Sequence, residues 1–224
     1  MAIQLGTLTL DEANTAAREQ YEEIAGRDVR VLVLTGLVTG IEDLDAQLDA
    51  ILAAASDADY GCALSLRPGR RLWVRRTGFL RESRPDRGVG SFELKLESRD
   101  PYEESIELHS ESWDIQASGT LTVSPSGNSA SLPVVSITAG AALVNPVVSD
   151  GVRSIAYAGT VNAGEMLVFD SAAERVTLDG EEVTSYASGA FPRLSPGGTA
   201  LTYTDDTPGP HAATATVAYR DRWW

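Results

Sequence analysis

The sequence predicts a mainly β protein with two domains and a single packed α-helix. Short runs of β-branched and aliphatic residues recur between turns that contain Gly and Pro, which is typical of antiparallel sheets. Residues 41–55 instead carry apolar residues at helical spacing. After about residue 108, charged residues become sparse, and Ser, Thr, Gly, Pro and Val take over. We therefore expect an N-terminal β domain at 1–108 that includes the helix, and a C-terminal β-sandwich at 109–224.

The first elements of the chain are strands, with one ambiguous segment between them. Residues 3–10 alternate weakly and predict a strand. Residues 11–25 are rich in Ala, Glu, Arg and Gln, whose propensities favour a helix, and an extended arm is an equally good interpretation. The β-branched run at 29–34, bounded by glycines, predicts a strand buried in the core.

The helix begins with a capping box. In residues 39–42 the Thr39 side chain can accept from first-turn amides while Glu42 reaches back. Apolar residues follow at helical spacing, namely Ile41, Leu44, Leu48, Ile51, Leu52 and Ala55. Three aspartates lie mostly outside that stripe, namely Asp43, Asp45 and Asp49. The pattern predicts one amphipathic helix of about 15 residues that packs on a sheet.

Residues 61–99 predict a β-meander. Its strands are expected at 63–66, 72–74, 78–80 and 91–97, with a Pro-Gly turn at 67–70 and a polar loop at 84–90. The last of these strands alternates apolar and charged residues along its whole length, and Asp100-Pro101 ends it because proline cannot continue the ladder.

The second half contains further short strands separated by turns. They are expected at 119–123, 166–170, 175–178, 182–184, 199–204 and 212–220. Asp179-Gly180 joins two of them and is the strongest short hairpin signal in the chain. Turn signals every ~8–12 residues predict a sandwich.

The net charge of −14 restricts the partners. Binding to duplex DNA or to anionic lipid needs a cationic surface, so we expect neither sequence-specific nucleic-acid binding nor membrane insertion. No apolar run approaches the roughly 18 residues of a membrane span, and the chain opens on a short amphipathic run rather than a signal peptide. We expect a protein that is soluble where it is made. Cys62 is the only cysteine, so an intrachain disulfide is impossible.

The residue types of a catalytic site do not come together in this sequence. The two histidines, His109 and His211, are too few for a zinc site or a Ser/His triad. Cys62 has no histidine nearby and is expected in the core. Adjacent carboxylates such as Asp205-Asp206 point to opposite faces of a strand, which favours solubilising turns over a hydrolase dyad or a calcium site. We expect no enzyme activity, no catalytic residue, no cofactor and no bound metal.

Three tryptophans are the candidate contacts with a partner or a glycan, namely Trp113, Trp223 and Trp224. The pair at the chain end would be costly if exposed. It therefore either folds back onto the sandwich or contacts a partner.

Several motifs occur in an order that is more specific than any one of them. In the first half, the strand and turn at 29–36 lead to the Leu-rich helix, then to 78–79, 92–97 and 100–102. In the second half the matching motifs lie at 164–170, 176–180, 191–197 and 219–223. This order resembles that of the distal tail proteins of siphophages. Two features depart from the family pattern: Gly198-Thr199 occupies a position where the family commonly has Asn, and residues 11–25 match no family motif.

The resemblance implies a structural protein that forms a hexameric ring at the tip of a long non-contractile tail. The N-terminal domain, barrel-like with one packed helix, would form the ring wall, and the C-terminal sandwich, galectin-like in fold, would sit outside. The implied partners are further copies of the chain, the tail tube protein, the tail hub or tail-associated protein, and receptor-binding proteins or fibres. The protein would be made in the host cytoplasm and lie at the distal end of the tail in the virion. DNA would pass through the ring without being read, for which an acidic lumen is suitable.

The uneven charge distribution suggests faces for such a ring. Residues 1–60 carry twelve Asp and Glu against three Arg, whereas residues 67–99 carry ten Lys and Arg against four Asp and Glu. The two segments could pair within a chain or between copies, or reflect ordinary surface mixing. Contacts in a closed ring join different faces of neighbouring subunits. The candidate interface residues are Arg75, Arg76 and Arg81 on the basic side and Asp43, Asp45 and Asp49 on the acidic side.

The sequence is also compatible with other functions. A carbohydrate-binding sandwich for host-surface adhesion could use an aromatic platform built from Trp113 with Tyr157, Tyr186 or Tyr203. Another tail tube or baseplate subunit is a further alternative, although a simple tube subunit has less need of an outer sandwich. A hydrolase is disfavoured because no triad, dyad or metal set converges.

Overall fold

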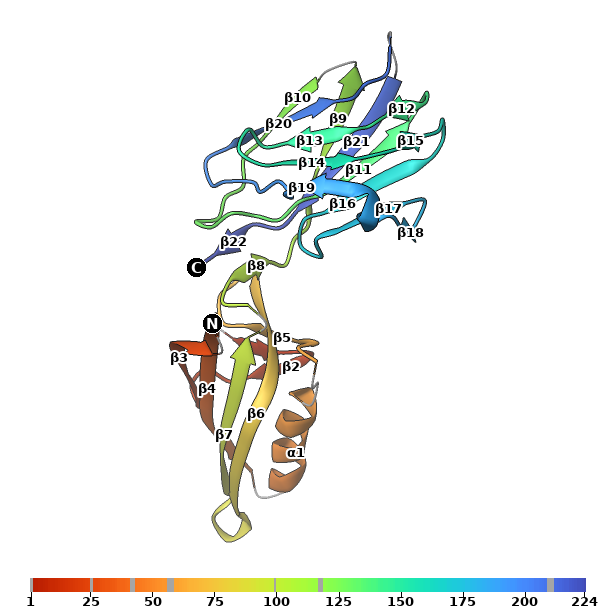
Figure 1. Ribbon diagram of the computed structural model, residues 1–224. Helices are drawn as coiled ribbons and strands as arrows, with labels where there is room; N and C mark the ends of the chain where they lie inside the picture. The colour runs from red at the N-terminus through yellow and green to blue at the C-terminus, as the bar shows by residue number, and fades with distance from the viewer. Residues whose placement is uncertain are drawn as a thin grey trace. The chain divides into compact units, whose positions relative to one another are not determined.

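The computed structural model describes residues 2–24, 26–40, 43–55, 59–98, 100–116, 119–208 and 212–224. The chain divides into two compact units, the first comprising residues 1–106 together with Trp224 and the second Glu107–Trp223 (Figure 1). Strands dominate both units, and the only α-helix among the described residues lies in the first. The predicted mainly β class with one packed helix is confirmed. No helix in the described ranges is long and apolar enough to cross a membrane.

The first unit is built on one antiparallel sheet with the strand order β2-β1-β5-β6-β7-β4-β3, and β8 pairs with β6. Its strands are β1 (Ile3–Leu5), β2 (Leu8–Leu10), β3 (Thr15–Ile24), β4 (Arg27–Thr39), β5 (Cys62–Ser65), β6 (Arg70–Arg84), β7 (Val89–Ser98) and β8 (Glu103–Ser105). A short 3₁₀ turn, η1 (Pro85–Arg87), joins β6 to β7. The predicted meander over 61–99 is present as β5, β6 and β7, and the strands predicted at 72–74 and 78–80 are parts of the single strand β6.

Strand β3 corrects the helical interpretation of residues 11–25. It pairs with β4 over its whole length, from Thr15 opposite Gly36 to Ile24 opposite Arg27. The helix propensity of its Ala, Glu and Gln residues is weak compared with a full ladder of interstrand hydrogen bonds. Its many charged side chains also suit its position at the end of the sheet, where they discourage pairing with other chains.

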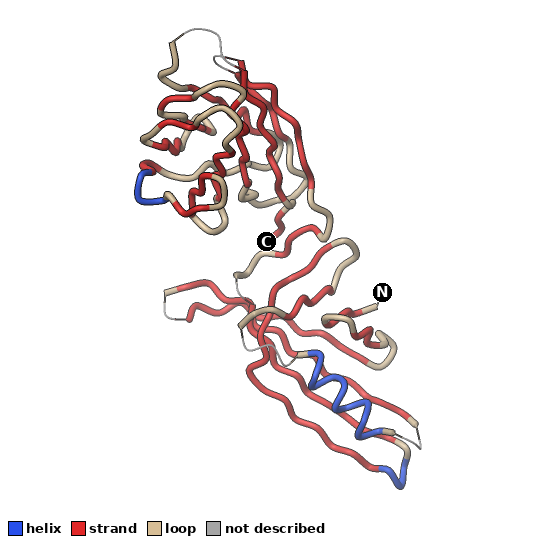
Figure 2. The backbone as a smooth tube through the Cα atoms, turned by 90° about the vertical axis from the view of Figure 1, so that its right-hand side faces the viewer, coloured by secondary structure: helices blue, strands red, loops and turns tan. Residues whose placement is uncertain are grey.

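Helix α1 (Leu44–Ala54) lies along one face of this sheet (Figure 2). Its buried residues, Leu44, Leu48 and Ile51, recur every three to four positions and pack towards the sheet. The helix begins later than the predicted residue 41, and Thr39 does not cap it, because Thr39 is still paired with Val89 at the end of β4. Of the other predicted residues at this end, Ile41 and Glu42 lie outside the described residues.

Asp43 precedes the helix in place of the predicted cap. It has a left-handed backbone, with a φ of 67°, and its side chain makes no capping hydrogen bond. The Asp43 carbonyl accepts from the Gln47 amide at 2.9 Å, which closes the first helical turn. Asp45 lies in that first turn, where a negative charge is favourable beside the positive end of the helix dipole.

The second unit has an apolar core enclosed by two sheets. One sheet has the order β10-β20-β13-β14-β19 and the other the order β18-β17-β16-β11-β21-β9 (Figure 1). The core draws on both, with Tyr203 from the first sheet and Phe169 from the second among its fully buried members. The predicted second-half strands over 119–220 are confirmed, with the one at 182–184 displaced to residues 181–182.

The strands of the second unit are short and follow one another closely. They are β9 (His109–Gln116), β10 (Gly119–Val123), β11 (Val134–Ala139), β12 (Leu143–Val144), β13 (Val147–Ser149), β14 (Ser154–Tyr157), β15 (Thr160–Val161), β16 (Met166–Asp170), β17 (Arg175–Leu178), β18 (Glu181–Glu182), β19 (Ala187–Gly189), β20 (Thr199–Thr204), β21 (Ala212–Tyr219) and β22 (Arg222–Trp223). A 3₁₀ turn, η2 (Thr184–Tyr186), precedes β19. The hairpin predicted at Asp179-Gly180 is confirmed, since both residues have positive φ, 48° and 87°, and Leu178 pairs with Glu181 across the turn.

Candidate functional site

Two buried charges of the first unit, Arg30 and Glu103, lie in what we call the Arg30 cluster, which also contains the more exposed Glu19, Arg67 and Arg70. Arg30 is only 1% exposed, yet it projects from a strand of Val and Leu residues. Its guanidinium donates to the Glu19 carboxylate, with an Nε–Oε2 distance of 3.1 Å, and lies 3.4 Å from the Glu103 carboxylate. Arg67 donates to both carboxylates, and Arg70 lies 3.7 Å from Glu103. Arg30 and Glu103 are the two members that depend most on this pairing, because an uncompensated buried charge is costly.

The charge balance within the cluster also acts on Arg67. Burial lowers the pKa of the Arg67 guanidinium, but the Glu103 and Glu19 carboxylates outweigh that effect and raise the pKa above its ordinary value. Arg67 therefore keeps its charge. None of the cluster residues was among the candidates predicted from the sequence. The signal that could have found the cluster is an Arg inside the buried run at 29–34, because arginine is almost never fully buried unless paired.

The predicted basic interface residues lie on two different faces of the sheet. Arg75 pairs with Glu97 at 3.2 Å and lies over the Tyr60 ring, 4.7 Å from its centroid. Arg76 and Arg81 instead reach towards α1, where Arg76 donates to the Leu52 carbonyl at 3.2 Å and Arg81 forms an ion pair with Asp49. The structure therefore brings Arg81 and Asp49 together within the chain and leaves Asp43 and Asp45 exposed at the start of the helix.

The sheet face opposite α1, which we call the outer face, carries two exposed leucines. In β7, Leu94 is buried and alternates with Glu93, which points to the other side. Leu80 is opposite Glu93 and Leu37 is opposite Ser91, so both leucines share that side. Leu80 is 66% exposed. Large apolar side chains among charged residues on a sheet face suit contact with another protein.

The predicted tryptophan contacts separate into buried and exposed residues. Trp113 is 3% exposed and packs edge-on against Tyr203 in the core of the second unit, so it cannot form a surface platform. Tyr203 and Tyr157 are buried as well, which removes three of the four residues proposed for the aromatic platform. The fourth, Tyr186, is exposed.

The two terminal tryptophans differ in exposure. Trp224 is 52% exposed and is grouped with the first unit, where it stacks on Tyr21 with ring centroids 5.5 Å apart. Its ring also lies edge-on to Tyr102 at 5.1 Å. Trp223 is partly buried. The chain end is therefore ordered by aromatic contacts, and one face of Trp224 stays accessible.

The residues that could have belonged to a catalytic or metal site make contacts within the fold. His109 lies 3.1 Å from the Asp221 carboxylate, which also accepts from the Ser126 amide. The buried Cys62 thiol donates to the Ala54 carbonyl at 3.3 Å. Asp205 accepts from the Tyr203 hydroxyl at 2.6 Å. His211 lies outside the described residues, and within the described ranges no three His, Cys, Asp or Glu side chains are grouped to hold a metal ion.

Comparison with known proteins relates the second unit to a known family. Residues 126–223 match the model of the siphovirus-type tail component, C-terminal domain. The C-terminal part of the chain therefore resembles this family of tail components. The predicted resemblance to siphophage distal tail proteins is thereby confirmed, and the family is one of structural proteins.

The whole chain also has a counterpart among solved structures. The crystal structure of the SPP1 Dit protein, described as a paradigm of the hub adsorption apparatus in phages that infect Gram-positive bacteria, matches it with a TM-score of 0.70. The two sequences are 14% identical, and the match covers 100% of this chain and 99% of the other. The likeness of fold therefore extends over both units of the chain. No curated protein matches the sequence.

Proposed function

We propose that this chain is a distal tail protein that forms a hexameric ring. The ring joins the tail tube to the tail hub and the receptor-binding apparatus, lies at the distal end of the tail in the virion, and has no enzymatic activity. The observation that carries the proposal is the likeness of fold to SPP1 Dit over both units. In this arrangement the first unit makes the ring, and the second is available for contacts outside it.

The outer face supplies the apolar part of the proposed ring contact. Leu80 and Leu37 project from it, and neither is needed to fill the core of the first unit. Interfaces gain most from a few apolar anchors surrounded by polar groups, which matches two leucines among charged neighbours. In a closed ring this face meets a different face of the next copy. The exposed Asp43 and Asp45 are our candidates on that second face, opposite the partly exposed Arg75.

The acidic character of the chain suits passage of DNA. With a net charge of −14, a ring of several copies carries a large negative charge, and like charge prevents the duplex from adhering to the lumen wall. We expect the lumen to be lined by acidic side chains. A map of the assembled ring with a basic lumen would overturn this part of the proposal.

The test is the native mass of the purified chain, alone and mixed with tail tube protein, with negative-stain images of the main peak. We expect rings with a central hole. Leu80→Glu should abolish them without unfolding the chain, whereas Val152→Glu, which alters an exposed residue of the second unit, should leave them intact. If Leu80→Glu assembles normally, the outer face is not the ring contact. If the wild-type chain stays monomeric even with the tube protein, the ring itself is wrong.

A further inference from the structure

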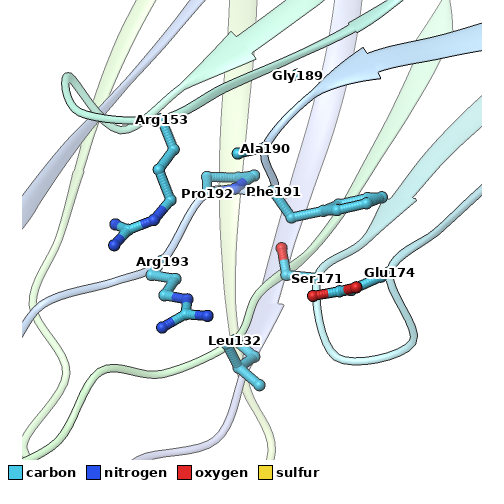
Figure 3. Close-up of a pocket in the computed structure, with 9 residues that line it drawn as sticks. All are labelled: Leu132, Arg153, Ser171, Glu174, Gly189, Ala190, Phe191, Pro192 and Arg193. Atoms are coloured by element: carbon cyan, nitrogen blue, oxygen red, sulfur yellow. The ribbon is translucent and has the colours of Figure 1, made fainter.

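The second unit contains a small pocket that is lined by polar side chains and one aromatic ring. It has a volume of about 290 Å³ and lies between the β13–β14 turn, the turn after β16 and the segment after β19 (Figure 3). Its polar lining residues are Arg153, Ser171, Glu174 and Arg193, and Phe191 supplies an aromatic ring. None of these residues entered the site predicted from the sequence.

The side chain of Asp150 joins two of the segments that line the pocket. Its buried carboxylate accepts hydrogen bonds from the amides of Val152 at 2.8 Å, Arg153 at 2.6 Å and Arg193 at 2.8 Å. It also lies 3.5 Å from the Arg153 guanidinium. Burial acts to raise the pKa of Asp150, but these hydrogen bonds prevail and hold the pKa below its ordinary value. The backbone segments that carry the two arginines are thus held together, and both side chains lie on one side of the pocket (Figure 3).

Ser171 contributes a hydroxyl that nothing in the described part of the chain satisfies. The residue is 5% exposed, and its Oγ has no hydrogen-bond partner there. Figure 3 shows this oxygen directed towards the space beside Phe191 and Pro192. A buried hydroxyl without a hydrogen-bond partner costs about 1–3 kcal/mol of stability. An unsatisfied hydroxyl beside a cavity therefore points to a ligand that supplies the missing hydrogen bond.

The charged groups across the pocket do not neutralise one another directly. Arg193 and Glu174 both line it, yet no ion pair joins them among the described contacts (Figure 3). Glu174 is held with a φ of 50°, in a left-handed conformation that is uncommon for glutamate. A hydrogen-bond donor and an acceptor are therefore presented from opposite sides. Counting Asp150 and Glu174 against Arg153 and Arg193, the formal charges of the site cancel.

We propose that this pocket binds one neutral saccharide unit. Sugar hydroxyls both donate and accept, so one ring can accept from Arg193, donate to Glu174 and satisfy the Ser171 hydroxyl. The C–H face of the same ring can pack on Phe191. The cancelled charge gives no advantage to an acidic ligand, and a volume just below the roughly 300–1,000 Å³ typical of drug-sized sites suits a single ring. This site is independent of the ring proposal, because every residue in it belongs to the second unit.

The test is an NMR titration of the full chain with glucose, galactose and N-acetylglucosamine, and with glucuronic acid as the acidic counterpart. We expect at least one neutral sugar to bind with a millimolar dissociation constant, and glucuronic acid to bind no better than glucose. Arg193→Gln and Glu174→Gln should each weaken binding roughly tenfold, since each removes a hydrogen bond to a charged group. Arg175→Gln and Glu182→Gln, at exposed positions outside the pocket, should bind as the wild type does.

Ser171→Ala offers a second readout with a matched control. Ser131 is also fully buried with an unsatisfied hydroxyl, but it does not line the pocket. Both alanine variants should fold at least as stably as the wild type, whereas only Ser171→Ala should weaken sugar binding, by several-fold. Equal binding by the two variants, tighter binding of glucuronic acid, or no binding of any neutral sugar at tens of millimolar would each overturn the proposal.

Discussion

The first unit places an arginine and a glutamate inside its fold, whereas the second unit fills its core with apolar side chains from two sheets. Arg30 and Glu103 are buried and joined through Glu19 and Arg67, so the first unit depends on a closed charge network. The buried core cluster of the second unit consists of aliphatic and aromatic side chains only. The first unit should therefore fail when one charge is removed, and the second when volume is removed.

The largest effect should come from Phe169→Ala in the second unit. Phe169 is fully buried in the apolar core, and the substitution leaves a cavity there. We expect a loss of about 3–5 kcal/mol in the free energy of unfolding of that unit. Hydrogen exchange resolved by residue should show faster exchange in β11, β16 and β21, with protection in β4 and β7 unchanged. Equal loss of protection in both units would mean that they unfold as one body.

Arg30→Met should instead destabilise the first unit and leave the second unit unchanged. It leaves the Glu103 and Glu19 carboxylates without their central partner, and we expect the first unit to lose about 3 kcal/mol while the second keeps its protection. Adding Glu103→Leu should restore part of the stability, because an apolar pair of similar volume can replace a buried ion pair. If the single variant is as stable as the wild type by the same exchange measurement, the Arg30 cluster does not hold the first unit together.

Alkaline pH should lower the free energy of unfolding of the second unit. Burial and then the neighbouring Asp205 raise the pKa of the Tyr203 hydroxyl far above its ordinary value of 10.0. The folded form therefore holds this proton more tightly than the unfolded chain, so the stabilisation is fully present below pH 10 and is lost as pH rises above it. The slope should reach up to about 1.4 kcal/mol per pH unit. Denaturant titrations from pH 9 to 11 should show a shallower decline for Tyr203→Phe than for the wild type. Parallel declines would exclude Tyr203 as the cause.

The smallest effect should come from Arg81→Glu on the helix side of the first unit. Arg81 and Asp49 are paired, but both side chains are largely exposed, so the pair should contribute no more than about 1 kcal/mol. The double variant Arg81→Asp with Asp49→Arg should recover wild-type stability if the pair acts only within the chain. Recovery of chemical stability without recovery of ring yield would show that Arg81 also contacts a neighbouring copy.

The sequence predictions succeeded where the interactions that determine the structure are local in sequence. The alternating strand at 91–97 and the Asp179-Gly180 hairpin were predicted because their determinants are local: side-chain alternation in one, positive φ in the other. Residues 11–25 were ambiguous because their propensity competes with pairing to a distant strand. Trp113 was a candidate contact for a partner or a glycan, yet it lies where β9 faces the core.

The sequence by itself determined the mainly β class, the meander, the existence of one helix and the resemblance to distal tail proteins. These follow from periodicity, turn residues and motif order, all of which can be identified in the sequence alone. Only the tertiary structure decided which charges meet, since Arg30 reaches Glu103 across 73 positions. It also decided which aromatic residues are buried and where the pocket of Arg193, Ser171 and Glu174 lies. These depend on packing between segments that are remote in sequence, and side-chain pattern alone does not fix that packing.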